Sequence, residues 1–458
     1  MKMKKNKIRV ISAVVSAIML ASSASVFAKF DAYNDSDGFT LGHYEVEVNQ
    51  EQRADTEKLY EQRPKNEKQF ENLSRGLVAV PGENGTLVSW RFLGTDSNSL
   101  TYNLYCSGEK LNDKPITTTN FFHTGASKNA EYTLKEVENG EETGVEYTTT
   151  AWDKNYIGFK VTEREGYNID DGAVADLDGD GEYEILLRRV PSMDVITRTS
   201  YPVIEAYKTD GTHMWTIDIG PNEINEVDIN FLAYDMDGDG KAEVIMRSFE
   251  GTTDGKGNTT GDTNGDGITD YSKSESNLTI FKDRQYIVST PEFLSIYDGE
   301  TGEETDRTDL KPSKEPLSDW SYRYSDTGRL TKRASHYLFG LAYLDGVTPS
   351  VVMVRGAWDN VRAAAWHIED GKFKEDWVHN TENKDDVNSI WGACNHNLVT
   401  VDVDFDGKDE ILSGPMAIDH DGSEMYAVKA YDNDGNAQKL AHGDAFDVAK
   451  TDPDFNGY

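Results

Sequence analysis

Four copies of one short acidic pattern constrain this chain more than any other feature. Each copy places oxygen-bearing side chains at positions 1, 3, 5 and 9 with glycine at position 6, and the copies span 176–184, 235–243, 262–270 and 402–410. Calcium takes six to eight oxygen ligands at flexible geometry, and such a loop folds several of them onto one point. Glycine permits the sharp turn that gathers them. Because the spacing is repeated, a merely solvated acidic turn is the weaker interpretation, and the sequence predicts several bound Ca²⁺ ions.

The predicted calcium ligands lie at the same positions in every loop. They are Asp176, Asp178, Asp180 and Glu184; Asp235, Asp237, Asp239 and Glu243; Asp262, Asn264, Asp266 and Asp270; and Asp402, Asp404, Asp406 and Glu410. An acid at position 9 separates these loops from EF-hands, whose closing glutamate stands at position 12. In three loops the ninth residue begins an apolar run, at 184–187, 243–246 and 410–412. A loop that leads directly into a strand favours an all-β repeat fold.

The charge balance excludes one class of partner. The chain carries 82 acidic and 46 basic residues, a net charge of −36. A nucleic-acid-binding protein needs an excess of Lys and Arg to neutralise phosphates, so no nucleic acid partner is expected. Bound divalent cations would offset part of the negative charge.

The first 28 residues have the features of a secretory signal. Basic residues precede an apolar stretch at 10–20, and small residues lead to Ala28, after which cleavage is expected. The apolar stretch is too short to span a membrane, and no other stretch approaches the roughly 20 apolar residues that a spanning helix needs. We therefore expect a secreted, extracellular protein, monomeric and without a membrane partner.

The remaining chain divides into three parts. Residues 29–70 are polar and irregular, which is typical of a linker or a peripheral strap. Short alternating segments over 71–160 predict a small β-sandwich of the fibronectin III-like type. Over 161–458, hairpins with Asp-Gly turns recur between the acidic loops and their strands, which is the pattern of β-propeller blades. The stretch 307–335 lacks that pattern and is interpreted as a long loop, where function often lies.

Several ordered motifs resemble those of the family 11 polysaccharide lyases, which are rhamnogalacturonan lyases. The matching segments are 75–80, 88–96, 102–105, 232–243, 250–255, 342–346, 349–356, 395–398 and 442–445. The resemblance covers roughly 70–458. It implies a small β-sheet domain before an eight-bladed propeller that holds several calcium ions. It also implies β-elimination on the rhamnose–galacturonate backbone of rhamnogalacturonan I, a plant cell-wall pectin.

The resemblance further implies metal ligands outside the acidic loops. These are His396 and His442, with Asp444 beside the second histidine, and Asp171 before the first loop. Judged without the resemblance, each histidine is as readily a structural residue as a ligand.

Other residues are implied in substrate binding. Family members commonly have an Asn-Asp pair near the sugar where this chain has Asp170-Asp171, and Lys-Trp-Asp where it has 189–191, Arg-Val-Pro. Asp170 is therefore a candidate sugar contact, and the exchange leaves the substrate preference open. Apart from the resemblance, Arg355 and Arg362 flank Trp358 and are candidates to bind sugar carboxylates, although both could be surface residues of a blade.

The catalytic base stays unassigned. The family sequences continue past the position matching Tyr458, so the propeller is expected to be incomplete and the base to lie beyond that residue. One alternative is a non-catalytic, calcium-stapled propeller that binds glycans or proteins. Another is a glycoside hydrolase, which needs two carboxylates about 5–10 Å apart. Endo or exo action remains open.

Overall fold

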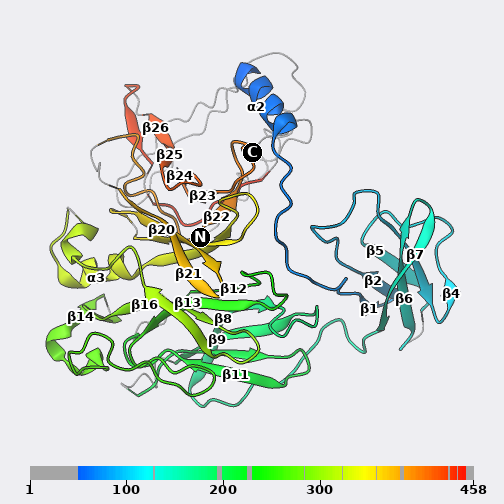
Figure 1. Ribbon diagram of the computed structural model, residues 1–458, viewed down its shortest axis with the longest axis horizontal. Coiled ribbons are helices and arrows are strands. Elements are labelled where there is room, and N and C mark those ends of the chain that lie inside the picture. The colour runs from blue at the N-terminus through cyan, green and yellow to red at the C-terminus, as the bar shows by residue number, and fades with distance from the viewer. Residues whose placement is uncertain are drawn as a thin grey trace, which may run out of the picture.

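The computed structural model describes residues 50–126, 129–192, 199–223, 230–282, 284–321, 323–356, 358–381, 386–431, 434–440 and 442–449. The predicted signal at 1–28 lies outside them. Within these ranges strands dominate, and the α-helices are α2 (Gln50–Gln62) and α3 (Thr327–Ser335) (Figure 1). The prediction of an all-β chain is therefore confirmed. Neither helix is long and apolar enough to cross a membrane.

Two sheets form a β-sandwich near the N-terminus. One has the order β1-β2-β5 and the other β4-β3-β6-β7. Their bounds are β1 (Val78–Gly82), β2 (Gly85–Ser89), β5 (Asn120–Thr124), β4 (Glu109–Lys110), β3 (Thr101–Cys106), β6 (Glu131–Glu138) and β7 (Glu141–Thr150). Alternate residues of β6 point inward, and both sheets contribute to one apolar core. In that core the rings of Trp90 and Tyr102 meet edge to face with centroids 5.2 Å apart.

Four further sheets follow, each of four antiparallel strands. They are β8 (Tyr167–Ala175), β9 (Glu184–Pro191), β10 (Val203–Tyr207) and β11 (His213–Asp218); β12 (Phe231–Tyr234), β13 (Glu243–Phe249), β16 (Glu292–Tyr297) and β17 (Glu304–Asp309); β18 (Tyr337–Ala342), β19 (Ser350–Arg355), β20 (Arg362–Glu369) and β21 (Lys372–Asn380); and β22 (Val399–Val401), β23 (Glu410–Ser413), β24 (Met416–Ile418) and β25 (Glu424–Ala427). Two hairpins accompany them, β14 (Leu278–Phe281) with β15 (Arg284–Ile287), and β26 (Lys429–Tyr431) with β27 (Ala437–Lys439).

The four sheets pack face to face in chain order, and an apolar cluster fills each interface. The clusters include Leu186 and Val244 between the first two sheets, Ile245 and Val351 between the second and third, and Val352 and Ile411 between the third and fourth. The first strands lie next to one another, β8 by β12, β12 by β18, and β18 by β22. A middle strand such as β19 is buried along its whole length, which explains its unbroken apolar run.

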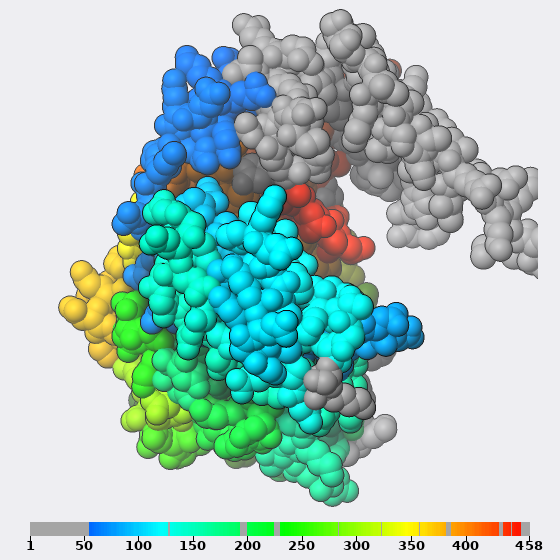
Figure 2. All heavy atoms as spheres, turned by 90° about the vertical axis from the view of Figure 1, so that its right-hand side faces the viewer, coloured from blue at the N-terminus to red at the C-terminus, as the bar shows by residue number. Residues whose placement is uncertain are grey.

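A strap at 63–75 runs between α2 and the sandwich and crosses the turns of the sheets; it is part of the blue segment in Figure 1. Its hydrogen bonds run from Asn66 Nδ2 to the Gly407 carbonyl (3.0 Å), from the Gln69 amide to the Val347 carbonyl (2.8 Å) and from the Ser74 amide to the Gly181 carbonyl (2.8 Å). Lys68 Nζ also lies 2.9 Å from Asp409 Oδ1. The strap thus links turns of the first, third and fourth sheets. Figure 2 shows the sandwich, in cyan, in front of those sheets.

Neither α-helix is predicted from the sequence. α2 is polar on every side, so it has no apolar stripe that a periodicity analysis could detect. α3 lies inside the stretch 307–335, which was interpreted as a loop. It is short, and Asp326 caps it by accepting a hydrogen bond from the Arg329 amide at 2.9 Å.

Candidate functional site

The predicted site residues divide between two ends of the four-stranded sheets. The acidic loops 176–184, 235–243 and 402–410 each join the first strand of a sheet to its second. We call this the loop end. Asp170 stands near the start of β8 and His396 just before β22, so both lie at the opposite end of their sheets. We call this the site end.

The first acid of each loop is held by backbone amides. Asp176 Oδ1 accepts from the Gly179 amide at 2.9 Å, and its Oδ2 accepts from the Gly181 amide at 2.8 Å. Asp235 binds Gly238 and Gly240 in the same way, at 2.7 and 3.0 Å. The glycine at position 6 has φ near +90° in these loops, which explains why glycine is needed there.

In the same three loops the acid at position 9 folds back over the turn. Glu184, Glu243 and Glu410 each accept one backbone hydrogen bond, at 2.8, 2.9 and 2.7 Å, from the residue that follows the first acid. Burial, with the neighbouring loop carboxylates adding to it, raises the pKa of Glu184 to about 6 and of Glu243 and Glu410 to about 8. These values indicate concentrated negative charge in an enclosed space.

The loops fit a divalent cation. Carboxylate oxygens of Asp176, Asp178 and Asp180 lie within 4.8 Å of one another, as do those of Asp235, Asp237 and Asp239, and those of Asp402, Asp404 and Glu410. Buried oxygens of Asp178, Asp402 and Glu410 have no hydrogen-bond partner. A buried carboxylate oxygen without a partner is costly, and a hard cation such as Ca²⁺ supplies the missing partner. His420 lies beside Asp406 and Glu410 and adds a possible nitrogen ligand.

The third loop differs at its last position. Asp262 accepts from the amides of Gly265 and Gly267 at 2.7 and 2.8 Å, as in the other loops. Asp270, however, accepts from the Ser272 amide at 3.1 Å and caps the short helix η2 (Tyr271–Lys273). Asp270 therefore does not fold back over its own loop, whereas the ninth acid does so in the other three loops. Asn264 donates to the Tyr271 hydroxyl at 3.0 Å.

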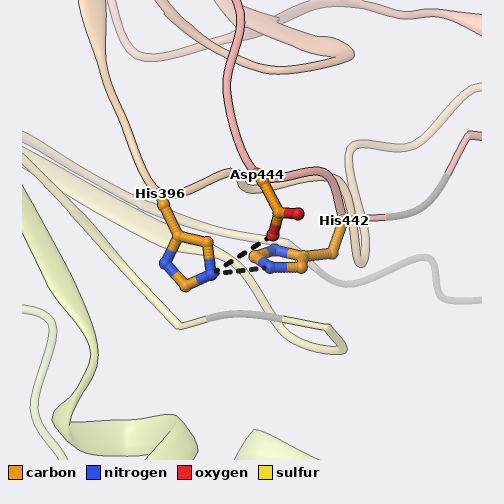
Figure 3. Close-up of side chains that lie close together, drawn as sticks. All are labelled: His396, His442 and Asp444. Atoms are coloured by element: carbon orange, nitrogen blue, oxygen red, sulfur yellow. Dashed lines mark hydrogen bonds and ion pairs between the residues drawn. The ribbon is translucent and has the colours of Figure 1, made fainter.

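At the site end the structure brings together three predicted metal ligands (Figure 3). His396 Nε2 lies 3.1 Å from His442 Nε2 and 3.9 Å from Asp444 Oδ1. His442 Nδ1 donates to the Cys394 carbonyl, which leaves its Nε2 lone pair directed toward His396. Burial lowers the pKa of His442, and His396 and His336 act in the same direction. The neutral imidazole of His442, the form that binds a metal ion, is thus favoured.

Two aromatic neighbours of this cluster were not predicted as site residues. His336 precedes β18, and its ring centroid lies 5.3 Å from that of His396. Trp358 lies 4.5 Å from His442, centroid to centroid. A lone histidine before a strand and a lone tryptophan in a turn give no sequence signal, because only the folded sheets bring them next to His396.

Asp170 and Asp171 lie on β8 opposite the end of β9. Arg188 forms an ion pair with Asp170, and its Nη2 lies 3.8 Å from Asp171 Oδ2. Both carboxylates remain accessible to a ligand, with side chains 40% and 60% exposed. Among the described residues, Asp171 does not belong to a compact group of metal-ligating side chains.

The two candidate arginines have structural partners. Arg355 is completely buried and donates to the Pro312 carbonyl at 2.9 Å and to Glu292 Oε2 at 2.7 Å. The predicted contact between Arg355 and a sugar is therefore not available in this structure. Arg362 forms an ion pair with Asp319 at 2.7 Å and stacks on Trp320, and its side chain is mostly buried. An arginine that ends an apolar strand looks the same in the sequence whether it faces solvent or a buried carboxylate.

Comparison with protein families gives two matches that adjoin along the chain. The family described as rhamnogalacturonan lyase family 11, C-terminal domain, matches residues 158–458. The rhamnogalacturonan I lyase beta-sheet domain matches residues 68–152.

Individual relatives agree with these matches. Rhamnogalacturonan endolyase YesW of Bacillus subtilis (strain 168) is 37% identical over 401 residues, which is 84% of this chain and 60% of that protein. Rhamnogalacturonan exolyase YesX of the same strain is 37% identical over 407 residues, covering 85% and 61%. The crystal structure of YesX superposes with a TM-score of 0.72 over 86% of this chain and 63% of that one. The chain thus spans about three fifths of the length of these relatives.

Proposed function

The chain belongs to rhamnogalacturonan lyase family 11, and on this basis we propose that it cleaves the rhamnose–galacturonate backbone of rhamnogalacturonan I by β-elimination. The observation that carries the proposal is the match of two adjoining lyase domains, over 68–152 and 158–458. The relatives YesW and YesX are named as an endolyase and an exolyase, and each is 37% identical to this chain. The mode of cleavage is therefore a result that the assay must supply.

Elimination removes the C5 proton of a galacturonate and breaks the bond between C4 and the glycosidic oxygen. The negative charge that develops beside the sugar carboxylate must be stabilised by a fixed cation. His396, His442 and Asp444 would hold such a cation at the site end, and the bound ion would neutralise the substrate carboxylate. Asp170, which is accessible at the same end of the sheets, would accept a hydrogen bond from a sugar hydroxyl.

We further propose that the acidic loops bind Ca²⁺ and that the four-stranded sheets are blades of a propeller. The orphaned buried oxygens of Asp178, Asp402 and Glu410 support the first proposal. The face-to-face packing of successive sheets, with their first strands adjacent, supports the second. The count of eight blades and secretion of the protein remain predictions that come from the family resemblance and from residues 1–28.

The test is an assay of the protein on rhamnogalacturonan I, with homogalacturonan as the control polymer. Elimination creates a double bond conjugated to the carboxylate of the new chain end, which absorbs ultraviolet light. We expect this absorbance to rise together with new reducing ends. New reducing ends without absorbance, or incorporation of solvent oxygen into the product, would show hydrolysis. Retention of the polymer without any cleavage would favour the alternative of a glycan-binding protein.

A further inference from the structure

Trp358 adopts a backbone conformation that a bulky residue rarely takes. It lies in the turn between β19 and β20 with φ of +66°, in the left-handed region. For a large side chain this conformation is unfavourable, and such residues persist where the surrounding structure enforces them, often at ligand sites. Trp358 is also 37% exposed, so burial does not by itself account for this conformation.

The residues that follow Trp358 fix the turn. Asp359 is fully buried, accepts a hydrogen bond from Ser321 Oγ at 2.7 Å and forms an ion pair with Arg333 of α3. Asn360 Nδ2 donates to the Asp319 carbonyl at 2.9 Å. These anchors hold the backbone in place while the indole stays at the surface.

The indole lies in a cluster of rings at the site end. Its centroid is 4.5 Å from His442, 6.0 Å from His396 and 6.2 Å from His336, and the Arg333 guanidinium lies 5.7 Å from it. Trp358 therefore borders the histidine pair that we propose to hold the cation, and the exposed part of its ring is available to a ligand bound there.

Basic side chains lie close to Trp358, although the chain has a net charge of −36. The helix α3 carries Arg329, Lys332 and Arg333, and Arg323 precedes it. The Arg323 side chain is 57% exposed, and its Nε lies 3.5 Å from Asp359 Oδ1, so Arg323 and Arg333 share one buried carboxylate. Arg323 thus pairs with the residue that follows Trp358. An exposed arginine and a partly exposed ring on one turn match a ligand that has both an apolar face and a carboxylate.

We propose that Trp358 is the stacking platform of a sugar subsite and that Arg323 pairs with the carboxylate of a uronate bound there. The C–H face of a pyranose ring would lie on the indole, and the guanidinium would fix the orientation of the sugar by its charge. Arg333 is a positioning residue, since it acts on the subsite through Asp359. This proposal rests on the proposed function and assigns residues of the described chain to specificity for uronate-containing oligosaccharides.

The test compares binding of a rhamnogalacturonan I oligosaccharide by calorimetry, in calcium, for the wild-type protein and for variants. Trp358→Ala should weaken binding about tenfold or more, and Trp358→Phe should retain most of the affinity because it keeps an aromatic face. The control Tyr156→Ala replaces an aromatic residue that is 58% exposed and lies in neither α3 nor the Trp358 turn, and it should leave the affinity unchanged. Wild-type affinity in Trp358→Ala would overturn the proposal.

Two further variants separate binding from folding and charge from stacking. Trp358→Gly should bind as weakly as Trp358→Ala yet melt no lower than it, because glycine relieves the strain at positive φ. An affinity that recovers in Trp358→Gly in step with its higher melting temperature would indicate a purely structural role. Arg323→Ala should weaken binding of the natural oligosaccharide but not of its carboxyl-reduced form, and an equal loss on both ligands would exclude the carboxylate contact.

The outcome for the wild-type protein distinguishes the two proposals. If the wild-type protein neither binds nor cleaves rhamnogalacturonan oligosaccharides, the proposed function and the subsite both fail. If it binds or cleaves them and Trp358→Ala does so equally well, only the subsite fails.

Discussion

Replacing Glu410 by glutamine should destabilise the calcium-loaded protein and stabilise the chelated protein. Glu410 has no exposed surface, and its Oε2 accepts from the Val403 amide at 2.7 Å while its Oε1 has no hydrogen-bond partner. Glutamine keeps an oxygen for the Val403 amide and the shape of the side chain. The substitution therefore removes mainly the charge, which is useful when a cation is bound and costly when it is not.

The magnitude for the chelated protein follows from the pKa of Glu410. Its displacement from 4.5 to about 8 corresponds to roughly 4–5 kcal/mol at about 1.36 kcal/mol per pKa unit. This is an upper limit at high pH, because an empty loop can relax and admit water. For a folding unit of roughly 300 residues, this free energy corresponds to a rise of at most about 7 °C in the melting temperature of the chelated protein.

The contribution of Glu410 to the stability of the chelated protein depends on pH. Between pH 4.5 and about 8 the folded chelated protein holds a proton on Glu410 that the unfolded chain has released. Stability therefore falls as pH rises through that window. The advantage of Glu410→Gln should be greatest near pH 8.5 and small near pH 5. In saturating calcium Glu410→Gln should instead lower the stability, because the site loses a ligand. A site that binds calcium 100-fold more weakly would lower the free energy of unfolding by about 2.7 kcal/mol.

The assay is thermal unfolding of the wild-type protein, Glu410→Gln and the exposed-site control Glu131→Gln, each in calcium and in excess chelator at both pH values. The expected result is a change of sign for Glu410→Gln between calcium and chelator at pH 8.5, with no change for the control. An equal loss of melting temperature in both conditions would refute the reasoning, because it would assign Glu410 to packing or hydrogen bonding alone.

Three further predictions concern stability. Chelation should lower the melting temperature of the wild-type protein by many degrees, since each site filled at 100 times its Kd adds about 2.7 kcal/mol. Asp237→Ala should lower the melting temperature in calcium by a smaller amount, because one loop among several loses its ion. A melting temperature that chelator does not change would contradict both predictions. Asn66→Ala should cost about 1 kcal/mol and speed protease cleavage within 63–75, whereas unchanged cleavage would show that its bond to Gly407 does not hold the strap. Ile411→Ala should cost about 2–5 kcal/mol in denaturant unfolding, against almost nothing for the exposed Ile280→Ala; similar values would contradict the packed interface.

The sequence allowed good prediction where a local pattern determines local geometry. The spacing of acids and glycine within 176–184 fixes which amides bind the first carboxylate, so the loop and the strand after it could be predicted together. The same pattern has a different geometry at Asp270, because Ser272 and Lys273 follow it in place of an apolar strand and draw its carboxylate to a helix cap. A ninth acid is thus informative only together with the residues after it.

Prediction was poor where a contact joins distant parts of the chain. Arg355 ends an apolar strand, and its partner Glu292 belongs to the neighbouring sheet, so its burial could not be inferred from its own surroundings. His336 and Trp358 are likewise separated by sequence from His396 and meet it only through the packing of sheets. Local residue types could suggest a metal site at His396, whereas the aromatic and basic residues around it needed the fold.

The distribution of charge between the two ends of the sheets explains how so acidic a protein could bind a polyanion. The loop end concentrates carboxylates of Asp176, Asp235 and Asp402 in groups that cations would neutralise. The site end carries the histidine cluster and the basic residues of α3, with Arg323 exposed. Because screening in physiological salt limits exposed charges to a range of about 8 Å, a galacturonate at the site end would respond to the cations near it far more than to carboxylates at the other end. Calcium in the three loops of the loop end would therefore act through stability, while binding of the polyanion would depend on the local groups around Trp358. The two dependences should separate experimentally as salt is raised.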